Sequence, residues 1–234
     1  MGARTILITG TSRGLGQALS EHFLAQGDTV IGCARSEGAI EHPQYQHHRV
    51  DITSEAEVTR LFSGLKRQHS HLDALINNAG IASMNAFALT PASTAARILN
   101  TNILGTFLFC QKALRLLKKS QNPRIVNFST IAVPLKLEGE SIYAASKSAI
   151  ETLTQVLSKE YAPFGITCNA IGPSPIDTAL IRNVPKAKID ALLQQQSVKQ
   201  MATAADVIHV IEFFLSPNSR QITGQKLYLG GFCA

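Results

Sequence analysis

The chain has 234 residues, of which 45% are hydrophobic and 16% are charged, a composition typical of one globular domain with a sizeable core. No apolar run approaches the roughly 20 residues that a membrane-spanning helix needs, so we expect no membrane segment. The formal net charge is +6 at pH 7. Because the basic residues are dispersed and aromatic residues are few, this charge does not indicate nucleic acid. It suits anionic small molecules or an acidic carrier protein.

The N-terminus and the cysteines predict a cytoplasmic location. The first residues lead directly into a strand-like run, which leaves no room for a signal peptide. The four cysteines are widely scattered, and we expect unpaired thiols in a reducing compartment. They are Cys33, Cys110, Cys168 and Cys233.

The first predicted element is a buried parallel strand over residues 5–9, an apolar and β-branched run. It ends in a glycine turn, Gly10-Thr11-Ser12-Arg13-Gly14-Leu15-Gly16, and an amphipathic helix follows as far as Gly27. Glycines let the backbone approach a ligand closely, and a helix N-terminus offers amide groups to a pyrophosphate. The spacing differs from the commonest dinucleotide fingerprint and from a Walker loop, but its place after the first strand predicts phosphate binding.

The second predicted strand, residues 29–34, is followed at once by Arg35. In a dinucleotide fold this position meets the adenine ribose, where an acidic residue binds the hydroxyl of NAD and arginine suits the 2′-phosphate of NADP. Arg13 in the glycine turn adds a second positive charge for the same phosphate. The pair favours NADP(H) over NAD(H); the alternative is two exposed arginines on a basic protein.

Three histidines between His42 and His48 raise the question of a metal site. No matching cysteine or carboxylate spacing accompanies them, so we interpret residues 42–48 as a solvated loop and expect no metal. A third strand is predicted over residues 49–52. The run Ser54-Glu55-Ala56-Glu57 then predicts a capping box at the start of a helix.

The fourth predicted strand, residues 72–76, ends in Asn77-Asn78-Ala79-Gly80. Small and amide residues at the carboxyl end of a parallel strand belong in the ligand crevice. A helix is predicted over residues 92–117. It carries Asn100 and Asn102 in its apolar middle, where asparagine is a poor helix former and calls for a local reason.

The fifth predicted strand, residues 125–128, ends in Ser129 and Thr130, and a helix over residues 143–161 follows. Tyr143 and Lys147 stand four residues apart and therefore project from one helix face. An ammonium group beside a phenol is expected to lower the phenol pKa. Such a pair can exchange a proton with an alcohol or a nascent alkoxide, although this spacing also arises by chance.

The remaining elements complete an alternating order of strands and helices. A sixth strand is predicted over residues 166–171, helices over 186–200 and 203–215, and a last strand over 226–229. This order without repeat or linker predicts an α/β Rossmann-type, doubly wound parallel sheet of about seven strands in a single domain, residues 1–234. Residues 1–120 would form the cofactor half and residues 121–234 the catalytic and substrate half.

With these motifs in place, the chain resembles the classical short-chain dehydrogenases/reductases over essentially its whole length. Several ordered motifs at matching separations make the resemblance specific. They are Thr9-Gly10-x-x-x-Gly14-x-Gly16, Asp51, Asn77-Asn78-Ala79-Gly80, Asn102, Ser129-Thr130, Tyr143-x-x-x-Lys147 and Pro173-x-x-Ile176-x-Thr178.

The resemblance implies a role for each matching residue. Tyr143 would be the general acid/base, Lys147 would lower the pKa of Tyr143 and bind the nicotinamide ribose, and Asn102 would hold a water of a proton relay. The implied cofactor-binding residues are Gly10, Ser12, Arg13, Gly14, Leu15 and Gly16 of the glycine turn, Arg35, Asp51 and Ile52 near the adenosine, Asn78, Ala79 and Gly80 on the ribose side, Tyr143 and Lys147, and Pro173, Ile176 and Thr178 near the carboxamide or phosphates.

Two positions depart from the family pattern. The family's catalytic serine lies thirteen residues before the tyrosine, and here that position is Thr130, with Ser129 as its neighbour. A threonine hydroxyl can polarise a carbonyl as serine does, and either residue could supply the hydroxyl. Ser174 stands where the family usually has glycine, so it must tolerate that backbone or the loop must run differently.

The implied activity is an NADPH-dependent carbonyl reductase that transfers hydride to a ketone, an oxidoreductase of CH–OH and C=O groups. Among subfamilies the chain looks most like the bacterial 3-oxoacyl-[acyl-carrier-protein] reductases, which dock an acidic carrier through basic residues. Lys118 and Lys119 lie near one docking position, but Phe164 replaces an arginine at the other. Two alternatives stay open: a dehydrogenase or reductase of a free small molecule, and a non-catalytic NADP(H)-binding sensor.

The resemblance also implies a homotetramer or homodimer formed through the helices near residues 102–117 and 143–161. The side chains that we expect around the substrate are mostly apolar, which predicts a hydrophobic or flexible-chain substrate. They are Met84, Pro134, Leu135, Leu137, Leu180 and Ile181.

Overall fold

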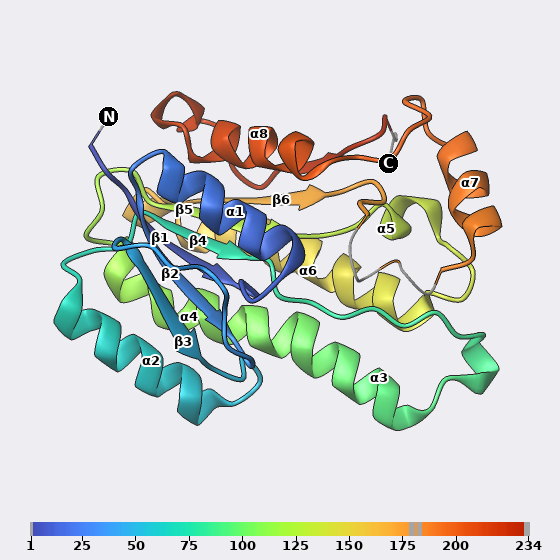
Figure 1. Cartoon of the computed structure of the whole chain (residues 1–234), viewed down its shortest axis with the longest axis horizontal. Coiled ribbons are helices and arrows are strands. Elements are labelled where there is room, and N and C mark those ends of the chain that lie inside the picture. The colour runs from blue at the N-terminus through green and yellow to red at the C-terminus, as the bar shows by residue number, and fades with distance from the viewer. Residues whose placement is uncertain (1, 178–180, 182–183, 232–234) are drawn as a thin grey trace.

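The computed structural model describes residues 2–177, 181 and 184–231, and these residues form a parallel sheet of seven strands in the order β3-β2-β1-β4-β5-β6-β7 (Figure 1). The predicted fold class is therefore confirmed. The strand order reverses between β1 and β4, which opens a crevice at the carboxyl ends of the strands. The strands are β1 (Thr5–Thr9), β2 (Thr29–Ala34), β3 (Tyr45–Arg49), β4 (Ala74–Asn77), β5 (Arg124–Phe128), β6 (Thr167–Gly172) and β7 (Lys226–Tyr228).

Helices cover both faces of the sheet (Figure 1). Helices α1 (Gly14–Ala25) and α8 (Ala204–Leu215) pack on one face, where Phe23 and Phe214 are buried in a shared core. Helices α2 (Glu55–Gln68), α4 (Gly105–Leu117) and α6 (Ser141–Glu160) pack on the other, around Phe62 and Phe109. Burial on both faces explains why the central strands read as continuous apolar runs.

Shorter helices complete the fold. Two α-helices, α5 (Ala132–Leu135) and α7 (Lys186–Gln194), lie beyond the carboxyl ends of the strands, and α3 (Ala92–Leu99) leads toward α4. Single 3₁₀ turns occupy Phe87–Leu89, Ala162–Phe164 and Pro217–Ser219. The predicted helix over residues 186–200 thus ends early, at Gln194, and turns follow it.

The predicted helix over residues 92–117 is interrupted by a π-helical turn, η2 (Asn100–Leu104). Asn102 lies in this turn, and its side chain hydrogen-bonds the backbone of Ile81. A π-turn inserts an extra residue into the helix, and such turns are frequent at functional sites. The local reason for asparagine in an apolar helix is therefore a specific hydrogen bond to the loop after β4.

The interpretation of residues 42–48 as a loop holds for residues 42–44 but was wrong from Tyr45 onward, because β3 covers Tyr45–Arg49 and pairs with β2. The predicted strand over residues 49–52 was likewise wrong beyond Arg49. As an edge strand, β3 tolerates polar residues, and the Tyr45 hydroxyl lies directly over Gly32 of β2, donating a hydrogen bond to Thr11. Within the described residues no group of histidine, cysteine and carboxylate side chains is arranged to hold a metal.

Helices α2 and α8 both have acidic residues in the first turn, but their N-terminal capping differs. At α8 the capping box is complete, because the Thr203 side chain accepts from the Asp206 amide and Asp206 accepts from the Thr203 amide. At α2 only half of the predicted box forms: Ser54 accepts from the Glu57 amide, but Glu57 accepts from the amide of Asp51. Glu57 therefore fixes the loop that carries Asp51.

The cysteines that the structure describes, Cys33, Cys110 and Cys168, are buried free thiols, and burial raises the pKa of Cys33 to about 12. Cys233 lies outside the described residues. The described helices include none that is both long and apolar enough to cross a bilayer.

Candidate active site

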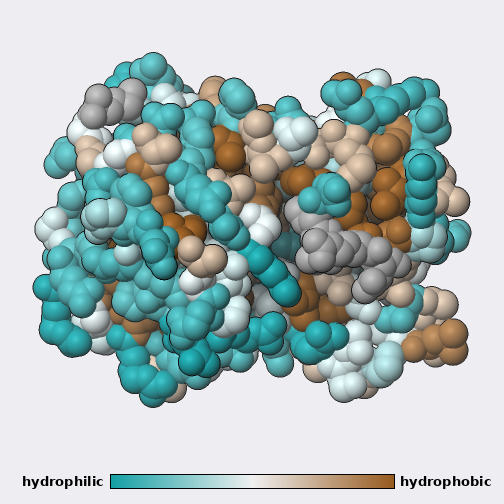
Figure 2. All heavy atoms as spheres, viewed as in Figure 1, coloured by the Kyte–Doolittle hydropathy of each residue, from teal (hydrophilic) through white to brown (hydrophobic). Residues whose placement is uncertain are grey.

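A cavity of about 1520 Å³ opens at the carboxyl ends of the strands, between the glycine turn and the α7 segment. Figure 2 shows the hollow near the centre of this face, with hydrophobic side chains gathered on the side of α5 and α7. Pockets for single small ligands measure roughly 300–1,000 Å³. This cavity is large enough for a dinucleotide and a second molecule.

Nearly all the predicted site residues line this one cavity. Asn102 does not line it but lies directly behind the wall, and Thr178 is outside the described residues. Those that line it are Gly10, Ser12, Arg13, Gly14, Leu15, Gly16, Arg35, Asp51, Ile52, Asn78, Ala79, Gly80, Thr130, Tyr143, Lys147, Pro173 and Ile176.

The glycine turn has the shape that a phosphate requires. Gly10 and Gly14 adopt φ values of 77° and 61°, which favour glycine. A Cβ on Gly16 would lie 2.1 Å from the Gly10 carbonyl oxygen, so only glycine fits. Helix α1 begins at Gly14, its N-cap residue Arg13 does not cap it, and its first turn contains no acidic residue. Its first amide groups can therefore donate to an anion, and the residues fit a dinucleotide pyrophosphate.

The end of the cavity beside the glycine turn, where we expect the adenosine, carries exposed positive charge. Arg13 and Arg35 are exposed and both line it. Asp51 is held in place, since its Oδ1 accepts from the Thr53 amide at 2.9 Å and the Thr53 hydroxyl at 2.8 Å. Oδ2 has no such contact with Thr53, and it suits an amino group such as that of adenine.

A hydrogen-bond chain behind this end was not predicted. The Tyr45 hydroxyl contacts Thr11 of the glycine turn and Nδ1 of His47, each at 3.0 Å, and His47 Nε2 lies 2.9 Å from the carbonyl oxygen of Ser36. The chain supports the loop that follows Arg35. Alternation of Tyr45 and His47 on one strand face was the available signal, and the assignment of these residues to a loop hid it.

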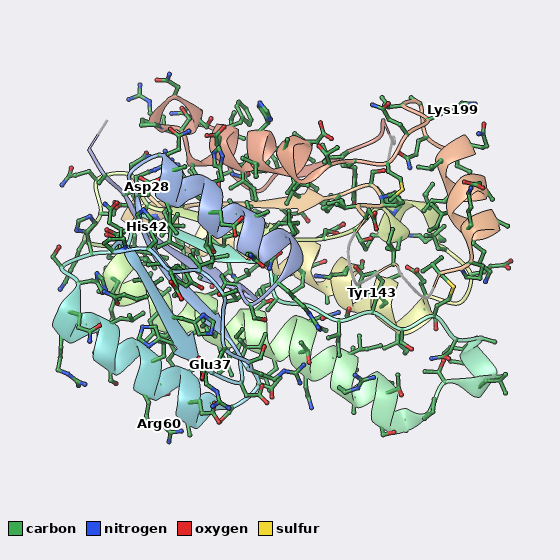
Figure 3. The ribbon with its side chains drawn as sticks, in the orientation of Figure 1. Asp28, Glu37, His42, Arg60, Tyr143 and Lys199 are labelled. Atoms are coloured by element: carbon green, nitrogen blue, oxygen red, sulfur yellow. The ribbon has the colours of Figure 1, made fainter. Side chains whose placement is uncertain are left out.

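At the other end of the cavity Tyr143 is buried beside Thr130 at the N-terminal part of α6, and Figure 3 shows Tyr143 far from the α2 residue Arg60. Burial raises the pKa of the Tyr143 phenol to about 12, and a hydrogen bond from Thr130 acts in the opposite direction. The expected lowering of this pKa by Lys147 is therefore not found, because desolvation of the buried phenol is the largest effect.

Lys147 lies one helical turn after Tyr143, and its Nζ donates to the Phe128 carbonyl oxygen at 2.8 Å. Burial lowers the pKa of Lys147 to about 8, so its ammonium form predominates only moderately at neutral pH. A Cβ on Gly80 would lie 3.3 Å from Nζ, so glycine leaves room at this point for a ligand to reach the lysine.

The neighbouring hydroxyl groups of Ser129 and Thr130 have different partners. The Ser129 hydroxyl donates to Oε1 of the buried Glu151, which also accepts from the Tyr228 hydroxyl at 2.6 Å. The Nζ of Lys226 lies 3.3 Å from the other oxygen of Glu151. This group joins β5, α6 and β7, whereas the Thr130 hydroxyl accepts from the Ala132 amide at 3.2 Å and lines the cavity with Tyr143.

Asn102 supports the catalytic helix from behind. Its Nδ2 donates to the Ile81 carbonyl oxygen and to the Ser146 hydroxyl, both at 2.9 Å, and the Ser146 hydroxyl donates to the Tyr143 carbonyl oxygen at 2.7 Å. The side chain thus connects the loop after β4 to the residue before Lys147.

Ser174 is accommodated without backbone strain. Among the described non-glycine residues only Lys136 has a positive φ, so the Ser174 backbone does not require glycine. Its buried hydroxyl donates to Gln196 Oε1 at 2.9 Å. The loop after β6 is thereby attached to the segment that follows α7.

Of the apolar side chains expected around the substrate, Met84, Leu137 and Ile181 line the cavity. Pro134 and Leu135 belong to α5 and are not among the lining residues, and Leu180 lies outside the described residues. A residue that sequence reasoning missed, Glu140, also lines the cavity. Its position three residues before Tyr143 was the available signal.

Comparison with known proteins agrees with this geometry. The family model for short chain dehydrogenase matches residues 4–189. The 2-(R)-hydroxypropyl-CoM dehydrogenase of Xanthobacter autotrophicus is 29% identical, with 98% of each chain covered. The 3-oxoacyl-[acyl-carrier-protein] reductase FabG of Escherichia coli is 28% identical, with 96% of this chain and 95% of the relative covered.

Solved structures of similar fold include further dehydrogenases. The aldohexose dehydrogenase of Thermoplasma acidophilum superposes with a TM-score of 0.88 at 26% identity, over 98% of this chain and 93% of that one. A short chain dehydrogenase of Leptospira borgpetersenii with bound NAD+ has the same score and identity, over 98% and 92%. ElxO with NADP bound also scores 0.88 at 26% identity, over 97% of both chains. The chain belongs to the short chain dehydrogenase family and is an NAD(P)-dependent oxidoreductase.

Proposed function

We propose that this protein is an NADP(H)-dependent carbonyl reductase in which Tyr143 is the general acid and Thr130 the hydroxyl that polarises the carbonyl. The observation that carries the proposal is that the buried Tyr143 phenol and the buried Thr130 side chain line the same cavity, with Lys147 one helical turn after Tyr143. A non-catalytic sensor would need no such proton-transfer group.

The bound nicotinamide cofactor supplies the hydride. Burial keeps the Tyr143 phenol protonated at neutral pH, so it can donate its proton to the oxygen of the reduced carbonyl. The Thr130 hydroxyl donates a hydrogen bond to the same oxygen, where negative charge develops. Lys147 holds a positive charge near the phenol and can bind ribose hydroxyl groups through the space beside Gly80. Asn102 fixes the helix that carries both residues.

The preference for NADP(H) is supported by the charges at the adenosine end. Arg35 follows β2 directly, Arg13 lies in the glycine turn, and both line the cavity. The nearest acidic residue after β2, Glu37, is 3.5 Å from Arg49 in an exposed ion pair. It is thus directed to β3, and the two arginines suit a 2′-phosphate.

The relatives suggest a 3-oxoacyl thioester as one substrate, and a free small ketone is the alternative. At the expected carrier-docking positions Lys118 lies over the ring of Phe164, with Nζ 4.2 Å from the ring centre. Lys118 keeps its charge but packs on the Phe164 ring, and Phe164 itself supplies no positive charge. The missing charge favours a free ketone or a short thioester over a carrier-bound one.

We further propose a homodimer or homotetramer formed through α4 and α6. Three apolar side chains on this side of the molecule are between a third and a half exposed, namely Leu104, Phe107 and Val156. Sedimentation of the wild type and of Phe107→Glu would test the proposal, because a charge at a subunit contact would shift the population toward the monomer.

The first test is titration of the purified protein with NADPH and NADH by nicotinamide fluorescence, followed by addition of acetoacetyl thioesters and free ketones. We expect tighter binding of NADPH and consumption of NADPH that falls about 10²- to 10⁴-fold in Tyr143→Phe. Tight binding without turnover across the panel would favour the sensor, and a preference for NADH would refute the interpretation of the arginines.

A further inference from the structure

Glu140 is a charged residue of the cavity that the proposed reaction does not use. It lies three positions before Tyr143 and lines the cavity together with Tyr143 and Thr130. Glu140 is the N-cap residue of α6, yet its side chain makes no capping hydrogen bond. The usual structural reason for an acidic residue at a helix start is therefore not realised here.

Glu140 is half-buried and shares the cavity wall with Tyr143 and Thr130. Burial raises the pKa of Glu140, Lys188 of α7 lowers it, and Glu140 in turn raises the pKa of Tyr143. Lys188 does not form an ion pair with Glu140; its Nζ contacts Met84 Sδ at 3.7 Å instead. Within the described residues no side chain donates a hydrogen bond to the Glu140 carboxylate.

Apolar side chains also line this cavity, among them Met84, Leu137, Ile181 and Leu192. A half-buried carboxylate in such surroundings has lost part of its hydration, which is unfavourable unless a donor replaces the water. A ligand that brings a donor to this point regains that free energy, and a ligand that brings a second carboxylate is repelled.

We propose that Glu140 forms a subsite for a hydroxyl or ammonium group on the substrate, close to the carbonyl that is reduced. The substrate would then be a ketone that carries a hydrogen-bond donor, not a purely hydrocarbon ketone. The inference rests on the proposed reductase function and narrows its substrate class. It adds a polar requirement to the expectation of a hydrophobic or flexible-chain substrate, which was drawn from the apolar residues.

The test compares four short ketones with NADPH: one with a hydroxyl group beside the carbonyl, one with an ammonium group, one with neither, and a keto acid. We expect kcat/KM for the first two to exceed that of the plain ketone at least tenfold, mainly through KM. In Glu140→Gln the preference for the ammonium ketone should fall about tenfold while the hydroxy ketone keeps most of its preference. In Glu140→Leu both preferences should disappear.

Glu138→Gln is the matched control, because Glu138 is exposed, lies two residues away and does not line the cavity. It should leave all ratios unchanged. Equal ratios in the wild type and both Glu140 variants would overturn the subsite while leaving the reductase intact. If no ketone is turned over, the reductase proposal fails, and calorimetry with the corresponding amino alcohol and its uncharged analogue on the NADPH-loaded protein decides the subsite separately. Equal affinity for the two would overturn it.

Discussion

The two ends of the cavity offer a ligand opposite physical surroundings. At the adenosine end, Arg13 and Arg35 are exposed and the glycine turn offers backbone amide groups. At the carbonyl end, Tyr143 and Lys147 are buried, and burial moves the pKa of each away from its ordinary value. Exposed charges are screened by water and salt, whereas desolvated groups respond strongly to each neighbour. We therefore expect substitutions at the carbonyl end to have the larger effects.

Among the substitutions considered below, the largest effect on activity should come from removing the Thr130 hydroxyl. Thr130→Val keeps the shape and removes the donor, so kcat should fall about 10²- to 10³-fold, whereas Thr130→Ser should stay within a few-fold of the wild type. Ser129→Ala is the matched comparison. It removes the hydrogen bond to Glu151, so it should lower the melting temperature and leave kcat within a few-fold of the wild type. The reverse pattern in steady-state kinetics would place the catalytic hydroxyl at Ser129.

The glycine turn should be nearly as sensitive, although it carries no side-chain chemistry. In Gly16→Ala the new Cβ would lie 2.1 Å from the Gly10 carbonyl oxygen, so the turn must move. Overpacking of this kind typically costs about 1–3 kcal/mol of stability. We expect a similar cost for returning the displaced turn to its binding geometry, which would raise the Kd for NADPH about 5- to 150-fold. Gly64→Ala in α2 is the control, since its Cβ would meet no atom within 4 Å. It should leave Kd unchanged, and fluorescence titration measures both.

A pH-dependent effect should come from Lys147, whose pKa burial lowers to about 8. Between pH 8 and 10 the unfolded chain keeps a proton on this lysine that the folded chain has lost, so this residue's contribution to stability rises with pH. The buried thiols act in the opposite direction because burial raises their pKa. The difference between the wild type and Lys147→Met isolates the lysine. From pH 8 to 10, the free energy of unfolding measured with denaturant should rise by about 2 kcal/mol in the wild type relative to Lys147→Met. A difference between the two proteins that does not change with pH would contradict the prediction.

The smallest effect should come from the exposed arginines. Arg35→Ala should raise the Kd for NADPH about tenfold, since it removes one charged contact, and should leave NADH binding unchanged. The effect should shrink as salt concentration increases. Arg67→Ala, an exposed change near the end of α2, is the control. A loss shared equally by NADH and NADPH would show that Arg35 supports the loop and does not read the phosphate.

Long apolar runs and the glycine turn could be predicted because their patterns are local. The strand over residues 5–9, the helix over 203–215 and the position of Tyr143 on a helix each depend on residues close in sequence. The edge strand β3 was missed because its polar residues are tolerated only when β2 lies beside it. The π-turn at Asn102 was missed as well, since its cause is the distant backbone of Ile81.

The sequence by itself determined the order of strands and helices, the family resemblance and a set of site residues of which nearly all line the cavity. Spacing along one chain is enough for these, because each motif is short. Only the tertiary structure separated Ser129 from Thr130, reversed the expected direction of the Tyr143 pKa and placed Glu140 in the cavity. Those three results depend on burial and on groups brought together from different elements, and one-dimensional spacing carries no information about desolvation.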